Sequence, residues 1–283
     1  MHPALRGVAW MSGAVLSFST MAIAARQLLA HMGPFQVLFV RSVVMLAIVL
    51  VVVAQAKGAV TATRRLPLHV LRNVIHFGGQ YCWVFAIGAL PLATVFAIEF
   101  TMPVWTALLA ALLLGERLTR NRLVMLALGF AGVLVILRPG VGAFHPAALV
   151  ALAAAFLYAG NMIATKRLST PDSPLAVLVW MSVIQTPLAL ATALPHWVAP
   201  PVGDLPWMLL IGIGSYTAHY CMTRAFKLAD ATLVVPIDFT RLPLIAVVGA
   251  VFYAEPFDPM VLVGAAVIFA GTYFSLTRET RGP

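Results

Sequence analysis

The sequence is poor in charged residues. Lys, Arg, Asp and Glu make up 10% of its 283 residues, whereas about 25% is typical of a soluble domain. By contrast, 62% of the residues are hydrophobic and the mean hydropathy is +0.98. A soluble chain of this composition would lack the polar surface that water requires. The composition therefore excludes a soluble domain and predicts an all-α polytopic membrane protein.

Cysteine and the motifs of metal and nucleotide chemistry are also scarce. Cys82 and Cys221 are the two cysteines, and both lie in apolar segments, where we expect them to pack as small side chains rather than form a disulfide. No HExxH motif and no clustered Cys/His set occurs, so the sequence offers no metal site, and we expect no cofactor. No GxxxxGK[ST] motif occurs either, so any pumping must use gradients.

What the sequence has instead is ten apolar segments of membrane-crossing length. About 20 residues of helix cross a hydrocarbon core of ~30 Å. The connections between the segments are short, and Met1 to Gly7 lead directly into the first, so we expect no soluble insertion and no cleavable signal. The predicted spans are residues 6–25, 35–54, 68–88, 93–114, 122–138, 146–165, 175–194, 206–226, 232–252 and 258–277.

The cations are divided unevenly between the two sides of these spans. Ten crossings place both termini on one side. If that side is cytoplasmic, the cations fall on cytoplasmic ends and loops, except for Arg26 and Arg138 outside and Arg41 and Arg241 within spans. Because cytoplasmic loops are rich in Lys and Arg, we expect both termini in the cytoplasm, below a bacterial-type inner membrane. Contact with anionic lipid headgroups then explains the net charge of +9, without nucleic acid as a partner.

The chain contains an internal repeat. Residues 81–132 can be laid without gaps on residues 220–271, and the identities include Phe100-Thr101 with Phe239-Thr240 and Glu116 with Glu255. Each half has an odd number of crossings, so the two copies must lie in opposite orientations. This is the inverted-repeat plan of secondary transporters, whose substrate sites lie near mid-membrane at the repeat interface. We therefore expect two five-helix repeats, residues 1–141 and 142–283, around a central cavity.

The fourth span carries both an acid and a proline inside its apolar run. Pro103 cannot donate a hydrogen bond to the carbonyl of Glu99, four residues earlier, so a carboxylate and a free backbone acceptor share one turn. An ionisable residue at this depth costs roughly 3 kcal/mol and usually faces a protein interior or a watery cavity. The repeat aligns Asp238 with Glu99, and Pro236 and Pro243 lie on either side of Asp238.

These two acids are the central candidates for a substrate or coupling site. Because the halves are inverted, Glu99 is expected near the outer end and Asp238 near the inner end, as opposed half-sites. The alternative is a pair of neutralised acids that only hold helices together. We expect Arg41 to pair with Glu99, at the same depth, and Arg241 to pair with Asp238, three residues earlier. For Arg41, the alternative is a structural cation that only holds the second span in place. Met181 takes the place of Arg41 in the second half.

Further polar and aromatic side chains lie within the spans. His76 and Gln80 are four residues apart and so share one helical face, and the repeat aligns Gln80 with His219. A buried histidine can carry protons, but it can equally be a packing residue. The remaining candidates for contact with a polar or flat solute are Tyr81, Tyr158, Asn161 and Trp180. For the aromatic residues, core or lipid-facing packing is the alternative.

Glycines recur in the fifth and tenth spans. Gly129 and Gly132, and Gly264 and Gly271, make these segments smooth enough for close helix packing. We interpret these two spans as supports that could also form a homodimer.

Several stretches resemble one known family. LFVRSVV around Arg41, ALPLATVFAIEFTMPVWTALLAALLLGERL and RAFKLADATLVVPIDFTRLPLIAVVGAVFYAEPF are similar to the signatures of EamA-type members of the drug/metabolite transporter superfamily. Ala254 replaces the usual glycine of the last motif. The resemblance implies ten helices in two inverted repeats and alternating access for small organic solutes. Its members include amino-acid exporters and an S-adenosylmethionine uptake branch, which HVLRNVIHFGGQYCWVFAIGALPLAT resembles.

The sequence therefore predicts a secondary transporter of small metabolites. Amino-acid export is the first expectation, by analogy with the family. Uptake or exchange of an S-adenosylmethionine-like cation is the alternative within the same class. Outside it, a passive channel or a membrane-embedded enzyme remains, although no nucleophile elbow, zincin helix or paired-aspartate motif supports an enzyme.

Overall fold

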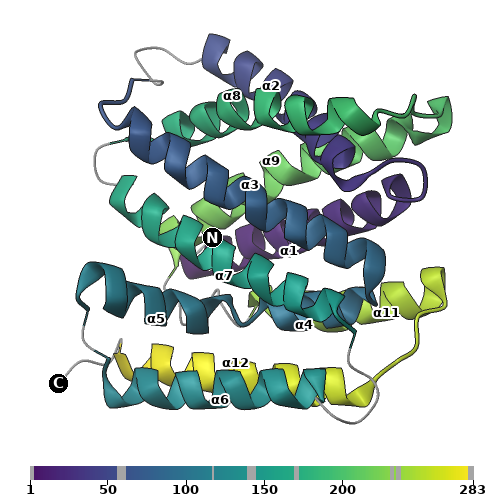
Figure 1. Cartoon of the computed structure of the whole chain (residues 1–283). Coiled ribbons are helices and arrows are strands. Elements are labelled where there is room, and N and C mark those ends of the chain that lie inside the picture. Colours follow the sequence, from purple (N-terminus) through teal and green to yellow (C-terminus); the bar gives the residue numbers. More distant parts are fainter. Residues whose placement is uncertain are drawn as a thin grey trace.

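The chain forms a bundle of helices (Figure 1). The computed structural model describes residues 3–55, 62–116, 118–138, 145–168, 172–229, 233 and 237–279. Within these residues there is no strand, and two short 3₁₀ turns, η1 (Leu194–His196) and η2 (Val202–Asp204), lie between α8 and α9. The α-helices are α1 (Pro3–Leu28), α2 (Pro34–Gln55), α3 (Leu66–Ala89), α4 (Leu92–Glu99), α5 (Met102–Leu114), α6 (Arg120–Leu137), α7 (Ala147–Leu168), α8 (Pro174–Ala193), α9 (Leu205–Leu228), α11 (Arg241–Tyr253) and α12 (Pro259–Glu279).

The predicted spans correspond to these helices. Among the described residues, seven helical stretches are long and apolar enough to cross a membrane, one of them formed by α4 and α5 together. Helices α3 and α9 are 24 residues long each, but they carry many of the polar side chains of the bundle. The fold is an all-α, multi-pass membrane protein with two inverted five-helix repeats. The division between residues 141 and 142 lies in undescribed residues and stays a prediction.

The fourth span is broken in the middle, as its proline leads one to expect. Helix α4 ends at Glu99, and α5 begins at Met102, with Pro103 in its first turn. Thr101 bridges the break, because its hydroxyl donates to the carbonyl of Ile98 at 2.7 Å and its own carbonyl accepts from the N–H of Val104 at 2.9 Å. In the second repeat, Pro243 lies in the first turn of α11, whereas Pro236 lies outside the described residues.

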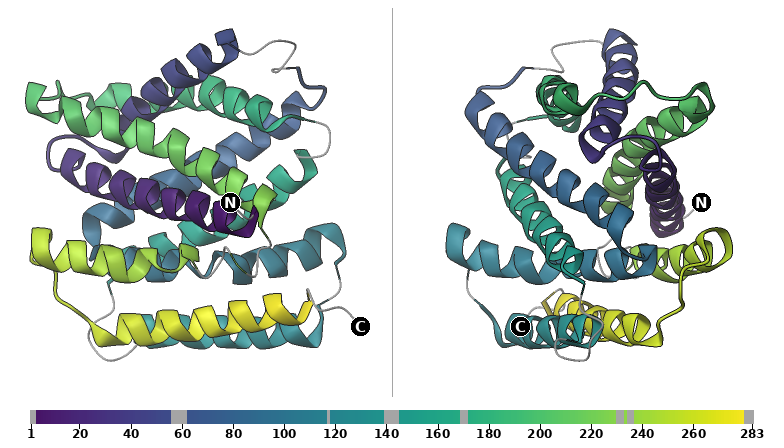
Figure 2. Two further views of the ribbon diagram at one scale, coloured as in Figure 1. Left: turned by 180° about the vertical axis from the view of Figure 1, so that it is seen from behind. Right: turned by 45° about the vertical axis from the view of Figure 1, so that its right-hand side comes forward.

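The helices pair across the two repeats. Helix α1 packs along α9 and α3 along α7, while α2 packs on α8 and α6 on α12 (Figures 1 and 2). In the repeat, α1 corresponds to α7, α2 to α8, α3 to α9 and α6 to α12. The α1–α9 pair is therefore equivalent to the α7–α3 pair, and the α2–α8 and α6–α12 pairs are each equivalent to themselves. The packing therefore has the two-fold pseudosymmetry of an inverted repeat.

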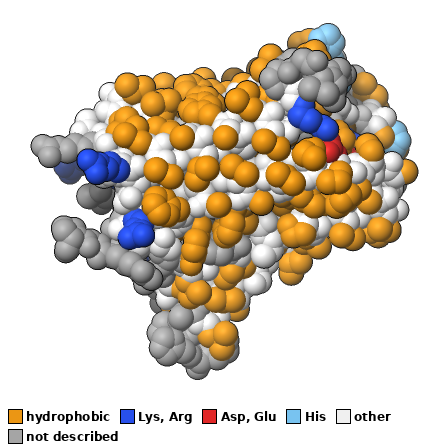
Figure 3. All heavy atoms as spheres, turned by 90° about the horizontal axis from the view of Figure 1, so that it is seen from below, with side chains coloured by type: hydrophobic (Ala, Val, Ile, Leu, Met, Phe, Trp, Pro, Cys, Tyr) orange, Lys and Arg blue, Asp and Glu red, His pale blue; other side chains and the backbone are white. Residues whose placement is uncertain are grey.

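The glycines of α6 and α12 are used within the chain. A Cβ on Gly132 would lie 2.6 Å from the carbonyl oxygen of Gly264, so only glycine permits this helix contact. The predicted support role agrees with this packing, and the homodimer stays a prediction. The outward faces are apolar: Leu112, Val251 and Phe252 are each at least 70% exposed. Figure 3 shows hydrophobic side chains spread over the face seen from below, as expected for contact with lipid.

Candidate intramembrane binding site

A buried arginine connects the two predicted acids. Arg241, the first residue of α11, has its Nη2 3.0 Å from Asp238 Oδ2, and Nη1 and Nη2 are each 3.4 Å from Glu99 Oε1. The side chains are 5% exposed for Arg241, 16% for Glu99 and 25% for Asp238. The predicted Asp238–Arg241 pair is confirmed.

The prediction of two opposed half-sites is wrong, because both carboxylates contact one guanidinium. The error lay in treating the acids as separated by depth. Helix α4 has eight residues, which rise about 12 Å, so its last residue, Glu99, comes close to the middle of a core ~30 Å thick. The long side chain of Arg241 spans the remaining distance.

Aromatic rings surround the same guanidinium. The Arg241 Cζ lies 4.8 Å from the ring centroid of Phe18, 5.3 Å from that of Phe96 and 5.1 Å from that of Phe100. Phe100 stacks on Phe239, its repeat equivalent, with centroids 4.2 Å apart. Trp83 Nε1 donates to Glu99 Oε2 at 2.6 Å. We call Glu99, Asp238, Phe18, Phe96 and Phe100 the cation cage.

Arg41 does not belong to this cage. Its Nε donates to Ser215 Oγ of α9 at 2.8 Å, and the side chain is buried. The expected Arg41–Glu99 pair is therefore wrong, because α2 packs on α8 and α9 and directs Arg41 toward them. Within the described ranges, no carboxylate forms an ion pair with Arg41.

His76 is the centre of a polar cluster next to Arg41. Gln80 Nε2 lies 3.2 Å from His76 Nδ1, which confirms that the two side chains share a face, and Gln185 Nε2 of α8 lies 3.0 Å from the same nitrogen. The ring of His219 is 6.2 Å away and that of Tyr158 is 5.7 Å away, between centroids. Arg41 and Arg72 both act electrostatically on His76 and His219. Tyr158 is within electrostatic reach of both Glu99 and Arg41, so it links this cluster to the cation cage.

Three of the predicted site residues, Tyr81, Trp180 and Asn161, make none of the contacts described above for these two groups. Tyr81 stacks on Phe35 of α2, with centroids 4.3 Å apart. The ring of Trp180 is 6.0 Å from that of His69, near one end of the bundle. Asn161 lies on α7, and its buried Oδ1 has no hydrogen-bond partner in the described part of the chain.

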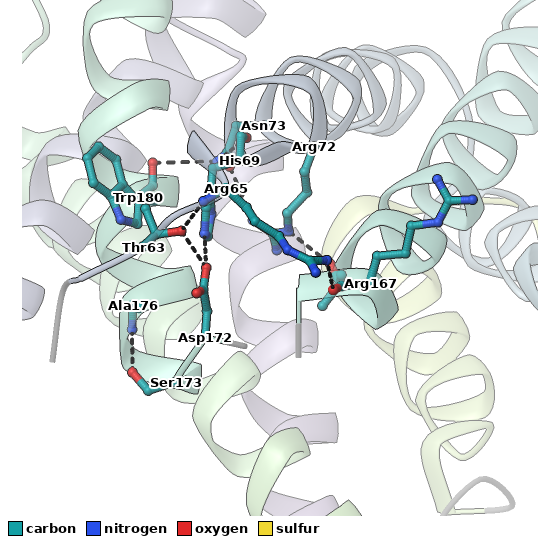
Figure 4. Close-up of polar contacts among 11 residues, drawn as sticks. Thr63, Arg65, His69, Arg72, Asn73, Arg167, Asp172, Ser173, Ala176 and Trp180 are labelled. Carbon is teal, nitrogen blue, oxygen red and sulfur yellow. Dashed lines mark hydrogen bonds and ion pairs between the residues drawn. The ribbon is translucent and has the colours of Figure 1, made fainter. Parts of the chain in front are cut away.

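A second polar cluster, not predicted from the sequence, lies at the start of α3 (Figure 4). His69 Nε2 lies 2.6 Å from Asp172 Oδ2, and Thr63 Oγ1 donates to the same oxygen at 2.7 Å. Asn73 Nδ2 donates to the His69 carbonyl at 2.8 Å, and Arg72 Nε donates to Thr165 Oγ1 at 2.8 Å. Burial acts to raise the pKa of Asp172, but the hydrogen bonds from His69 and Thr63 outweigh it and hold that pKa below its usual value. The sequence does carry one sign of this cluster: residues 69, 73, 76 and 80 are spaced so that they line one face of a helix.

Each end of the bundle also has an ion pair between the repeats. At the termini end, where α1 begins and α12 ends, Lys166 Nζ lies 2.7 Å from Glu116 Oε1. At the opposite, far end, Arg26 pairs with Glu255, which also accepts the N–H of Leu92 at 2.7 Å. The far pair is the more buried, with side chains 20% and 9% exposed, against 63% and 27% for Lys166 and Glu116. The termini end is also closed by the His69–Asp172 contact between the repeats, whose side chains are 0% and 3% exposed.

The far end also holds a cavity, of about 240 Å³, lined by Thr94, Arg138 and Glu255 among others. Neither Arg41 nor Arg241 lines it. In the described residues, no group of three or more His, Cys, Asp or Glu side chains could hold a metal ion. The polar clusters at mid-membrane remain the candidates for binding a solute.

Comparison with known proteins gives a consistent result. The profile of the EamA-like transporter family matches residues 5–138 and again residues 145–277. The chain is 26% identical to an S-adenosylmethionine uptake transporter of Rickettsia prowazekii, over 98% of this chain and 94% of that protein. It is 29% identical to a riboflavin transporter of Vibrio cholerae, over 99% and 96%, and 25% identical to the pseudopaline exporter CntI of Pseudomonas aeruginosa, over 95% of both. One crystal structure aligns with a TM-score of 0.68 at 20% identity, covering 97% of this chain and 98% of that one, which shows the fold alone.

Proposed function

The chain belongs to the EamA-like transporter family of the drug/metabolite transporter superfamily, and from this we propose that it carries small metabolites with an α-amino-acid head group. Its relatives are transporters of small metabolites, not enzymes.

The observation that carries the proposal is a buried arginine, Arg41, and a separate pair of acids in the cation cage, both within electrostatic reach of Tyr158. Arg41 is 4% exposed, and no carboxylate in the described residues pairs with it. A buried, unpaired charge is costly in a membrane protein. A substrate carboxylate would compensate this charge, and a guanidinium can bind a carboxylate with two parallel hydrogen bonds.

The cation cage suits the cationic end of such a solute. Glu99 and Asp238 are two carboxylates that share the single guanidinium of Arg241. When both acids are ionised, the group keeps one net negative charge. A zwitterion would therefore lie with its carboxylate toward Arg41 and its cation toward the acids.

Amino-acid export was the first expectation from the sequence, and plain amino acids fit this arrangement. A second candidate, uptake or exchange of an S-adenosylmethionine-like metabolite, is favoured by a specific observation. The cage combines net negative charge with three aromatic rings, which is the environment that attracts sulfonium and quaternary ammonium groups. Several relatives that match nearly the whole chain carry the name S-adenosylmethionine uptake transporter. Both candidates share the α-amino-acid head group.

The ion pairs at the two ends provide the means for alternating access. Glu255 joins α11 to α1 and α4 at the far end, and Glu116, its repeat equivalent, joins the end of α5 to α7 at the termini end. Opening one end while the other stays closed would expose the site to each side in turn. We expect both termini to be cytoplasmic, so the far end would face outward.

Counterflow in proteoliposomes tests this function. Vesicles are loaded with an unlabelled solute, and entry of the labelled solute is followed at two pH values. The panel contains amino acids, S-adenosylmethionine, riboflavin and S-adenosylhomocysteine, which lacks the positive charge on sulfur. Saturable, trans-stimulated flux of amino-acid compounds supports the proposal and excludes a channel. Counterflow of riboflavin alone, or wild-type rates in both Glu99→Gln and Asp238→Asn, would refute the proposed site.

A further inference from the structure

We infer that Arg241 is a built-in substitute for the substrate's cationic group, and that an organic cation of the sulfonium, guanidinium or ammonium class displaces it from the cation cage. This inference rests on the proposed function, and it explains how the transporter compensates its buried acids when no substrate is bound.

The cage has the composition of a cation-binding site. Phe18 of α1 and Phe96 of α4 present their rings to the guanidinium, as does Phe100 just after α4, with Cζ-to-centroid distances of 4.8 to 5.3 Å. Such distances are those of cation–π contacts, which strengthen when the site is desolvated. The rings and Glu99 belong to the first repeat, whereas Arg241 enters from the second. Asp238 belongs to the second repeat and moves with Arg241, but Glu99 and the three rings can separate from Arg241 when the repeats move relative to each other.

Arg241 fills this cage imperfectly. Its Nη atoms are 3.4 Å from Glu99 Oε1, whereas charge-assisted N–H···O bonds are usually 2.7–2.9 Å long. Arg241 Nε and Asp238 Oδ1 are 3.0 Å apart, yet both are buried and neither makes a hydrogen bond of good geometry with any described residue. The acids thus retain capacity for a better-placed cation.

The position of Arg241 in the chain also permits displacement. It is the first residue of α11 and follows the turn at Phe239 and Thr240, so its side chain is held at a helix end rather than within a continuous helix. The repeat places Met102 at the equivalent position in the first half. The scaffold therefore accommodates an uncharged residue at the start of this half-helix.

A built-in cation has a consequence for transport without substrate. A carrier must pass through an occluded state to return empty, and occluding two unpaired carboxylates would be costly. Arg241 compensates one of these charges when no substrate is bound. With Arg241, the empty carrier can return and net uptake is possible; without it, only the loaded carrier crosses and the protein becomes an exchanger.

The test compares net uptake with exchange in the same proteoliposomes, using labelled S-adenosylmethionine as the probe. For Arg241→Met we expect net uptake to fall at least about tenfold, the equivalent of 1.4 kcal/mol, while exchange continues. Binding of S-adenosylmethionine in detergent should become tighter, because the internal competitor is removed. Arg241→Lys keeps the charge and should keep net uptake. The matched control is Arg278→Met, which removes an arginine lying over Phe274 in the last turn of α12 and should change neither flux.

The outcomes separate the two ideas. Undiminished net uptake in Arg241→Met, or loss of net uptake with intact exchange in Arg241→Lys, would overturn the inference alone. Loss of exchange as well in a monodisperse Arg241→Met protein would also overturn it, because the residue would then serve the loaded carrier. If the wild-type protein moves neither S-adenosylmethionine nor any amino acid, the proposed function fails, and the inference fails with it.

Discussion

Replacing Asp172 with Asn should destabilise the protein, because it removes the charge at the centre of a buried contact between the repeats. His69 is fully buried, and the Asp172 side chain is 3% exposed. The carboxylate oxygen lies 2.6 Å from His69 Nε2 and accepts the Thr63 hydroxyl at 2.7 Å (Figure 4). Hydrogen bonds to charged groups contribute about 1.5–3 kcal/mol each to stability. The side-chain oxygen of the introduced Asn can still accept a hydrogen bond, so part of this contribution remains. We expect a loss of about 2–3 kcal/mol, or roughly 5–10 °C in melting temperature.

Thermal unfolding in detergent measures this effect. A thiol-reactive dye reports unfolding, because Cys82 and Cys221 are free and only partly exposed in the fold. Asp258→Asn is the matched control: Asp258 pairs with Arg138, but these side chains are 32% and 33% exposed, and exposed pairs contribute about 0–1 kcal/mol.

The pH dependence of the same experiment gives a second check. Hydrogen bonds hold the pKa of Asp172 below its usual value of 3.8, against the effect of burial. The ionised form therefore stabilises the fold above the usual pKa, and this contribution is lost as the pH falls through the lowered pKa. The advantage of wild type over Asp172→Asn should stay constant from pH 8 to pH 5 and shrink only below about pH 4. Equal losses in Asp172→Asn and Asp258→Asn, or an advantage that declines between pH 7 and pH 5, would refute this reasoning.

Three further predictions concern other parts of the bundle. Arg26→Gln leaves a buried carboxylate without its partner, so thiol labelling from the far end should increase. Lys166→Gln removes a more exposed partner at the termini end, so labelling from that side should increase less. Arg41→Lys removes the planar fork of donors, so the KM for an amino-acid substrate should rise about tenfold in counterflow, whereas an unchanged KM would assign Arg41 a purely structural role. Gly132→Ala forces α6 and α12 apart and should cost about 1–3 kcal/mol in the same melting assay, whereas Gly33→Ala meets no atom within 4 Å and should cost far less.

Most of the fold could be predicted because lipid imposes a simple rule on sequence. A helix must supply a continuous apolar run to cross the core, so each span could be located from hydropathy. The break after Glu99 could also be anticipated, since Pro103 removes a helical hydrogen bond whatever surrounds it. These are local properties, and local sequence determines them.

The partners of the buried charges were harder to predict, because depth in the membrane does not specify which helices are neighbours. Asp238 and Arg241 were paired correctly because they share one turn. Arg41 and Glu99 were paired wrongly because equal depth was taken for proximity, while α2 in fact directs Arg41 to Ser215. His69 was missed for a related reason: its partner, Asp172, comes from the connection between α7 and α8. No pattern within α3 identifies that connection as a neighbour.

The duplicated scaffold carries an asymmetric set of charges, and this asymmetry bears on how a substrate is held. Arg41 has Met181 as its repeat equivalent, and Arg241 has Met102, so neither of these two buried arginines has a counterpart in the other repeat. Met181 is buried against Met45 and Val49, as an apolar residue should be. Had both arginines been duplicated, a zwitterion could bind in two opposite orientations related by the pseudosymmetry. Under the proposed function, the carboxylate of a zwitterion binds Arg41 and its cation binds the two acids. This would favour one orientation of the substrate, whichever end of the site is open.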